Sequence, residues 1–135
     1  MTEPSRNRHH RWVDWETLLD SAMISKGEGL TELFMEAPSL VDLSFLFTFP
    51  INDPRDRARH ILPFLWELDD QAFAYLTALE RWPYGDDVVL WKVIEDETSL
   101  RLCYMQSQVN DEQVVGFAKT GDGWQFQGMD PRFWV

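Results

Sequence analysis

The chain has 135 residues, of which 44% are hydrophobic, and 23 acidic against 12 basic side chains give a formal net charge of −11. This length fits one domain, and the hydrophobic content excludes an intrinsically disordered chain. The negative charge repels phosphate backbones and anionic lipid, so we expect no direct binding to nucleic acid and no membrane association. A single cysteine excludes an internal disulfide, and the polar first residues carry no signal-peptide pattern, so we expect a cytoplasmic protein.

The first part of the chain is predicted to be helical after a flexible arm. Residues 1–11 lack apolar periodicity, and we expect a single domain over residues 12–135. Asp14 is a good N-cap for a helix whose apolar residues recur at helical spacing over 15–23. The same spacing over 30–37 predicts a second, shorter helix.

The middle of the chain contains one ambiguous segment and two predicted helices. In residues 39–49, Leu43, Phe45, Phe47 and Phe49 stand at every second position, as in a strand. Ser39 and Asp42 resemble a capping box at the start of a helix, but we favour the strand. Asp53 followed by Pro54 marks a helix start, and Pro63 is expected to kink or break this helix. Asp69 or Asp70 would then cap a further helix, which ends near residue 82.

The last part of the chain is predicted to form strands over residues 88–94, 100–107, 113–119 and 124–127, which are rich in β-branched and aromatic residues. The connections are short and polar, which is typical of an antiparallel meander. In the first of these strands, alternation places Val89, Trp91 and Val93 on one face. The predicted fold class is therefore α+β, with about four N-terminal helices packed on a C-terminal antiparallel sheet of about four strands.

No motif in the sequence indicates catalysis. The chain lacks G-x-G-x-x-G, P-loop, G-x-S-x-G and C-x-x-C patterns, so we predict no cofactor and no catalytic residue. Cys103 lies in a predicted strand and is expected to be an inert buried thiol. His9, His10 and His60 do not have the spacing of zinc ligands, so no metal site is predicted.

Charged clusters occur mainly at predicted caps and turns. The acidic groups are Asp69-Asp70, Asp86-Asp87, Glu95-Asp96-Glu97 and Asp111-Glu112, and exposed acids are ordinary at such positions. Arg55 and Arg59 share a helix face, where they could hold an anion, but salt bridges to nearby acids are the favoured interpretation.

The aromatic residues give the clearest indication of function. Trp15, Trp66 and Trp91 fall on predicted core faces, whereas other aromatics stand at element ends or chain ends, where exposed rings can anchor an interface. We therefore predict a non-enzymatic, acidic protein-binding module, such as an inhibitor or immunity-type protein that blocks a basic nuclease or nucleic-acid-binding protein. The predicted partner-binding residues are Asp69, Asp70, Trp82, Tyr84, Asp86, Asp87, Glu95, Asp96, Glu97 and Trp134.

Two alternatives stay open. The first is a small-ligand or enzymatic site in an apolar pocket between the helices and a curved sheet, lined by Trp91, Tyr104, Phe117 and Phe126, with His60 or Asp87 as the polar group. The second is a homodimer that hides an exposed sheet face, with the charge serving only solubility.

Overall fold

A computed structural model describes residues 14–36, 42–79, 89–105, 112–121 and 123–129. These residues form the helices α1 (Trp15–Leu19) and α2 (Pro54–Thr77) and the strands β1 (Met23–Gly27), β2 (Leu30–Met35), β3 (Leu43–Phe47), β4 (Val89–Glu95), β5 (Ser99–Met105), β6 (Glu112–Lys119) and β7 (Trp124–Met129). The predicted arm over residues 1–11 lies outside the described ranges.

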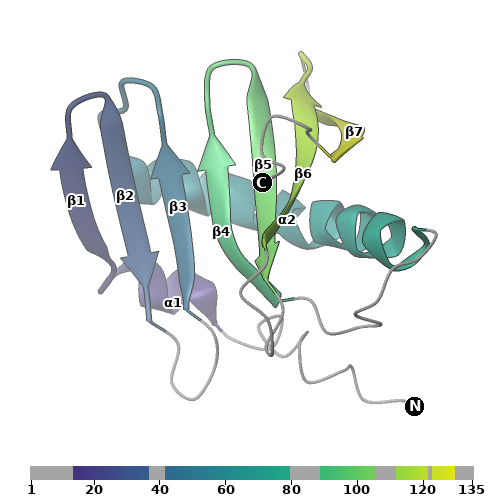
Figure 1. The fold of residues 1–135 in the computed structure, drawn as a ribbon. Coiled ribbons are helices and arrows are strands. Elements are labelled where there is room, and N and C mark those ends of the chain that lie inside the picture. Colours follow the sequence, from purple (N-terminus) through teal and green to yellow (C-terminus); the bar gives the residue numbers. More distant parts are fainter. Residues whose placement is uncertain (1–13, 37–41, 80–88, 106–111, 122, 130–135) are drawn as a thin grey trace.

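All seven strands belong to one sheet, in which their spatial order is their order along the chain (Figure 1). Neighbouring strands are antiparallel, except that β3 and β4 are parallel. Parallel neighbours need a crossover connection, because the chain must return to the end at which it started. The segment that contains α2 is this crossover, so the longest helix connects the two central strands and lies across one face of the sheet (Figure 1).

The predicted fold class is wrong in its balance of helix and strand. The structure has a seven-stranded mixed sheet and two helices over its described residues, instead of about four helices on a four-stranded antiparallel sheet. Residues 30–37 were expected to be helical, yet Leu30–Met35 forms β2. Thr31, Leu33 and Met35 are buried and alternate with more exposed residues. This two-residue repeat is that of a strand, and β2 pairs with β1 on one side and β3 on the other.

The helices predicted to start at Asp53 and at Asp69 or Asp70 are a single helix of 24 residues, so neither Asp69 nor Asp70 is a helix cap. Asp53 caps it, since its side chain accepts a hydrogen bond from the Asp56 backbone N–H at 3.1 Å, as the Asp53-Pro54 pattern predicted. Pro63 lies on an exposed position of α2, where its ring is turned away from the sheet. The expected break does not occur, because the buried stripe of α2 continues on both sides of the proline.

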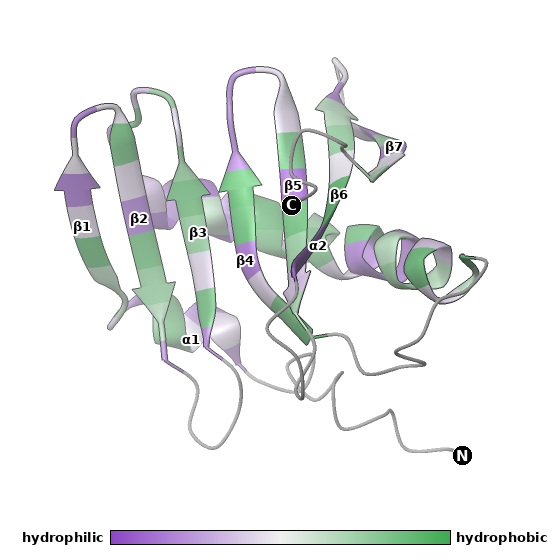
Figure 2. Ribbon diagram, viewed as in Figure 1, coloured by the Kyte–Doolittle hydropathy of each residue, from purple (hydrophilic) through white to green (hydrophobic). Residues whose placement is uncertain are grey.

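The core lies between α2 and the covered face of the sheet. One row of side chains crosses five strands on this face, and each member is fully buried: Leu33, Phe45, Val93, Leu102 and Val115. Figure 2 shows apolar residues on the central strands β3 and β4 and in bands along α2. Within the described ranges, no helix combines the length and apolar character required to cross a membrane.

Candidate functional site

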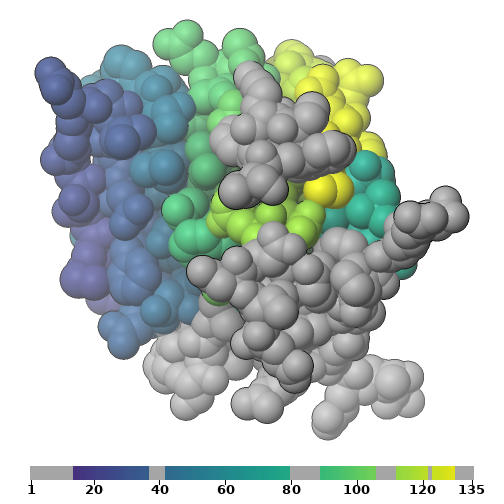
Figure 3. All heavy atoms as spheres, in the orientation of Figure 1, coloured from purple at the N-terminus to yellow at the C-terminus, as the bar shows by residue number. Residues whose placement is uncertain are grey.

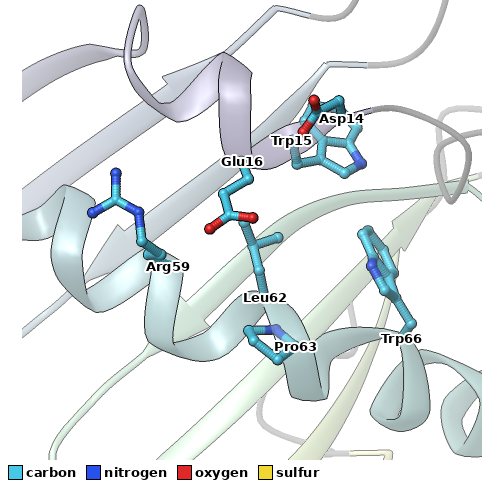
Figure 4. Close-up of a pocket in the computed structure, with 7 residues that line it drawn as sticks. All are labelled: Asp14, Trp15, Glu16, Arg59, Leu62, Pro63 and Trp66. Carbon is cyan, nitrogen blue, oxygen red and sulfur yellow. The ribbon is translucent and has the colours of Figure 1, made fainter.

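A groove between α1 and α2 joins charged and aromatic side chains. Its volume is about 250 Å³. It is lined by Asp14, Trp15, Glu16, Arg59, Leu62, Pro63 and Trp66 (Figure 4). The last four recur at i, i+3, i+4 and i+7, so they form one stripe along α2.

Helix α1 is short, and specific contacts hold it at the edge of this groove. The Asp14 carboxylate caps it by accepting hydrogen bonds from the Thr17 backbone N–H at 3.2 Å and the Thr17 hydroxyl at 2.7 Å. At the other end, the Arg55 guanidinium donates to the carbonyl oxygens of Leu19 at 3.0 Å and Ala22 at 2.8 Å. The Leu19 carbonyl also accepts a hydrogen bond from the Ala22 backbone N–H at 3.2 Å, so Arg55 fixes the turn that follows α1, and its guanidinium is engaged by the backbone.

The side of the groove that α1 contributes is acidic and the side that α2 contributes is largely apolar. The hydrogen bonds from Thr17 lower the pKa of Asp14, so this carboxylate is ionised near neutral pH. Glu16 is exposed and extends from α1 toward α2 (Figure 4). Trp15 is almost fully buried, whereas Trp66 is only half-buried and lines the groove with its ring.

Among the described residues that line the groove, Arg59 is the one cation. Its guanidinium lies 3.6 Å from the carboxylate of Asp20, and both side chains are well exposed, so this ion pair is weak. Arg59 contacts an acid, as the favoured interpretation of the sequence expected, whereas Arg55 binds backbone carbonyls instead of an acid. The two guanidinium groups are thus engaged separately and do not act as one anion clamp.

Two of the predicted partner-binding acids are buried instead of exposed. Asp69 lies on the core side of α2 and accepts a hydrogen bond from the hydroxyl of Tyr104, which is also buried. Glu95 accepts hydrogen bonds from the guanidinium of Arg57 and lies 3.2 Å from the ammonium of Lys119. Both carboxylates thus bind groups of the protein itself and are not exposed to a partner.

Asp96 organises the connection between β4 and β5. Its carboxylate accepts hydrogen bonds from the backbone N–H groups of Thr98 at 2.8 Å and Ser99 at 2.6 Å, and from Arg101 at 3.0 Å. Burial raises its pKa, but the hydrogen bonds and the Arg101 charge outweigh burial and leave the pKa below its usual value. Asp96 is therefore a charged turn residue with its oxygen atoms already engaged.

The other predicted partner-binding residues are either exposed on different elements or outside the described ranges. Asp70 is exposed on α2 and Glu97 is exposed in the turn after β4. Trp82, Tyr84, Asp86, Asp87 and Trp134 lie outside the described residues.

The described side chains proposed for an apolar ligand pocket do not all lie together. Phe117 and Phe126 are in contact, with ring centroids 5.7 Å apart, and Phe126 also packs against Tyr75, with ring centroids 5.1 Å apart. Tyr104 and Phe117 are buried in the core. Trp91 lines a hollow on the opposite face of the sheet, and His60 is exposed on α2. Asp87 lies outside the described residues.

The groove was not predicted, because the sequence pattern of both its tryptophans, Trp15 and Trp66, is typical of core positions. The stripe formed by Arg59, Leu62, Pro63 and Trp66 was a usable signal, since a proline and a charged residue rarely share a fully buried helix face. The approach of α1 to this stripe depends on tertiary contacts, which no local pattern in the sequence encodes.

The described residues contain no group of three or more His, Cys, Asp or Glu side chains placed to hold a metal ion. Comparison of the chain with protein-family models, curated proteins and solved structures finds no match. Function therefore has to be argued from the groove and the charge distribution.

Proposed function

We propose that this protein is a binding module for a basic segment of another protein, and that the segment docks in the groove between α1 and α2. The observation that carries the proposal is the composition of this groove, which combines the carboxylates of Asp14 and Glu16 with the half-buried ring of Trp66. Carboxylates attract a cation over a distance, and an indole face binds it at short range.

The distribution of charge beyond the groove supports the same proposal. Arg55, Arg57, Arg101 and Lys119 all contact carbonyls or carboxylates of the protein itself. Among the described lysines and arginines, only Lys26 is exposed as a whole residue, and the side chain of Arg59 is 41% exposed beside Asp20. Exposed acids are more numerous and lie on helices, strand ends and turns: Asp14, Glu16, Asp20, Glu28, Glu36, Asp53, Asp56, Glu67, Asp70, Glu97 and Glu112. The surface that a partner approaches is therefore more acidic than the composition alone implies.

An arginine side chain fits the chemistry of the groove better than a lysine side chain. A planar guanidinium can stack on the ring of Trp66 while it donates hydrogen bonds to the Glu16 carboxylate. The apolar wall of Leu62 and Pro63 suits the methylene stem of the same side chain.

An inhibitor or immunity-type protein that blocks a basic enzyme is one form that such a module can take. The proposal places the protein in the cytoplasm, where a chain with a single cysteine needs no oxidising environment. It assigns no bond chemistry to the protein.

The proposal is tested by calorimetric titration of the protein with a hexa-arginine peptide at low and at physiological salt. We expect saturable binding that weakens as salt screens the charges, and weaker binding of hexa-lysine. Trp66→Ala should weaken hexa-arginine binding about tenfold, because a central aromatic contact is lost. Glu16→Gln should weaken it about threefold, since one exposed carboxylate is removed.

Glu97→Gln is the matched control, because it removes the same charge from an exposed turn outside the groove. This variant should bind the peptide as tightly as the unchanged protein at physiological salt. Equal losses for Glu16→Gln and Glu97→Gln would show that the peptide senses only net charge, and the groove would then not be the binding site.

A further inference from the structure

The groove between α1 and α2 carries different charges at its two ends. It lies on the helix-covered side of the sheet, whereas Figure 3 shows the other side, where β1, β2 and β3 face the viewer. At one end, the Arg59 guanidinium lies beside Asp20, the residue that caps the carboxyl-terminal end of α1. At the other end, Asp14 caps the amino-terminal end of α1 and lines the groove together with Trp66 (Figure 4). A carboxylate beside an aromatic ring thus marks one end, and a guanidinium marks the other.

Arg59 is the described arginine whose donors are least engaged by the protein. Arg55, Arg57 and Arg101 each donate hydrogen bonds to carbonyl or carboxylate oxygen atoms of the described residues. The Arg59 guanidinium instead lies 3.6 Å from the Asp20 carboxylate, which is beyond hydrogen-bond distance, and its side chain is 41% exposed. Its N–H groups can therefore donate to a carboxylate that a bound segment brings into the groove.

The length of the groove sets the spacing of the charges that a bound segment must carry. Arg59 and Trp66 lie two turns apart on α2, which corresponds to roughly 10 Å along the helix. A segment in the polyproline II conformation advances roughly 9 Å in three residues, and residues three apart then point to the same side. A cation and an anion three residues apart in such a segment can therefore reach the two ends of the groove together.

We propose that Arg59 determines the specificity of the groove by binding a carboxylate of the docked segment, an inference that rests on the proposed function. The segment then places an arginine at the end with Asp14 and Trp66, and an aspartate or glutamate three residues away at the end with Arg59. An uninterrupted run of basic residues fits less well, because it sets a second cation against Arg59. The partner is therefore a protein segment that carries both charges at this spacing.

The test is NMR titration of the full chain with terminally blocked peptides. Arg-Pro-Pro-Glu and Glu-Pro-Pro-Arg hold the two charges three residues apart, in either order, whereas Arg-Glu-Pro-Pro and Glu-Arg-Pro-Pro have the same composition with adjacent charges. We expect one of the two spaced peptides to bind at least about threefold tighter than its isomer, because only the spaced peptide contacts both ends of the groove. Arg59→Gln should abolish this preference and should tighten the binding of hexa-arginine, since it removes a repulsive charge. Arg59→Lys keeps the charge and should keep most of the preference.

Lys26→Gln is the matched control, because it removes an exposed cation that does not line the groove. It should leave the binding of every peptide unchanged at physiological salt, and circular dichroism should show that all variants fold. The inference is overturned if neither spaced peptide binds tighter than its isomer, or if Arg59→Gln and Lys26→Gln have the same effect. Hexa-arginine separates this failure from that of the proposed function. Binding that depends on Trp66 but not on Arg59 would overturn only the role of Arg59, whereas no saturable binding of hexa-arginine would overturn the proposed function as well.

Discussion

The two faces of the sheet are built from alternate residues of the same strands, yet they serve different purposes. On the face under α2, Leu33, Phe45 and Val93 are fully sealed from solvent, whereas their chain neighbours Leu46 and Ile94 on the other face are only half-buried. The difference arises because α1 and α2 lie on one side of the sheet (Figure 1). Burial of apolar side chains therefore stabilises the fold mainly through the face under α2.

The largest change in the free energy of unfolding should come from truncating one side chain on each face to alanine. Phe45→Ala is expected to lower the free energy of unfolding by about 3–5 kcal/mol, because it opens a cavity in the sealed row. Leu46→Ala, one residue along the same strand, should cost less than about 1.5 kcal/mol, since its side chain is already partly in water. Urea unfolding of both variants measures the difference. Equal losses would contradict the division between the faces.

The covered face also contains a buried carboxylate, Glu95, whose charge is balanced by Arg57 and Lys119. Glu95→Gln should lower the free energy of unfolding by about 2 kcal/mol, because Arg57 and Lys119 lose their shared counter-charge at a site where Glu95 is 1% exposed. Glu97→Gln removes the same charge two residues along the chain, where the side chain is exposed, and should change stability by less than about 0.5 kcal/mol. Urea unfolding again provides the measurement, and a Glu95→Gln variant as stable as Glu97→Gln would contradict a structural role for the pair.

A smaller loss is expected from the hydrogen bond between Tyr104 and Asp69. Tyr104→Phe leaves the shape of the core unchanged but removes a donor from a fully buried carboxylate, which should cost about 1–2 kcal/mol. Tyr75→Phe is the control, because the Tyr75 ring is half-buried against Phe126. Thermal unfolding of both variants should separate them, and identical melting temperatures would argue against the buried bond.

The smallest effect concerns Cys103, which is buried although its register places it on the face away from the helices. Burial raises the pKa of its thiol to about 12. The folded protein should therefore not react with a disulfide reagent at about pH 8, whereas the unfolded chain should react at once. Because the folded pKa lies above the unfolded one, the thiol adds stability below the unfolded pKa of 9.0 and this contribution is lost as pH rises toward 12. Rapid labelling of the folded protein would contradict this account.

Part of the fold was predictable from local patterns. The four strands of the C-terminal part overlap the observed β4 to β7, and these strands pair in antiparallel order as their short connections implied. The Asp14 and Asp53 caps were also identified from residue type alone, and both side chains accept the hydrogen bonds expected of them.

The remaining errors arise where tertiary contacts override local spacing. In a short window such as residues 30–37, apolar residues at i and i+3 fit a helix, and only the pairing of β2 with β1 and β3 selects the strand. Alternation placed Trp91 with Val93 on one face, but the bulge before Lys92 separates them. Burial of Asp69 depends on a hydroxyl 35 residues away, which no local pattern reveals.

The most direct test of the proposed function follows the tryptophan indole N–H signals by NMR during titration with the hexa-arginine peptide. The chain has seven tryptophans, and Trp66→Phe and Trp91→Phe identify the two signals that distinguish the helix groove from the opposite sheet face. We predict that the Trp66 signal shifts with saturation and that the Trp91 signal does not. A shift of the Trp91 signal alone, or no saturable shift at Trp66, would contradict the groove as the binding site.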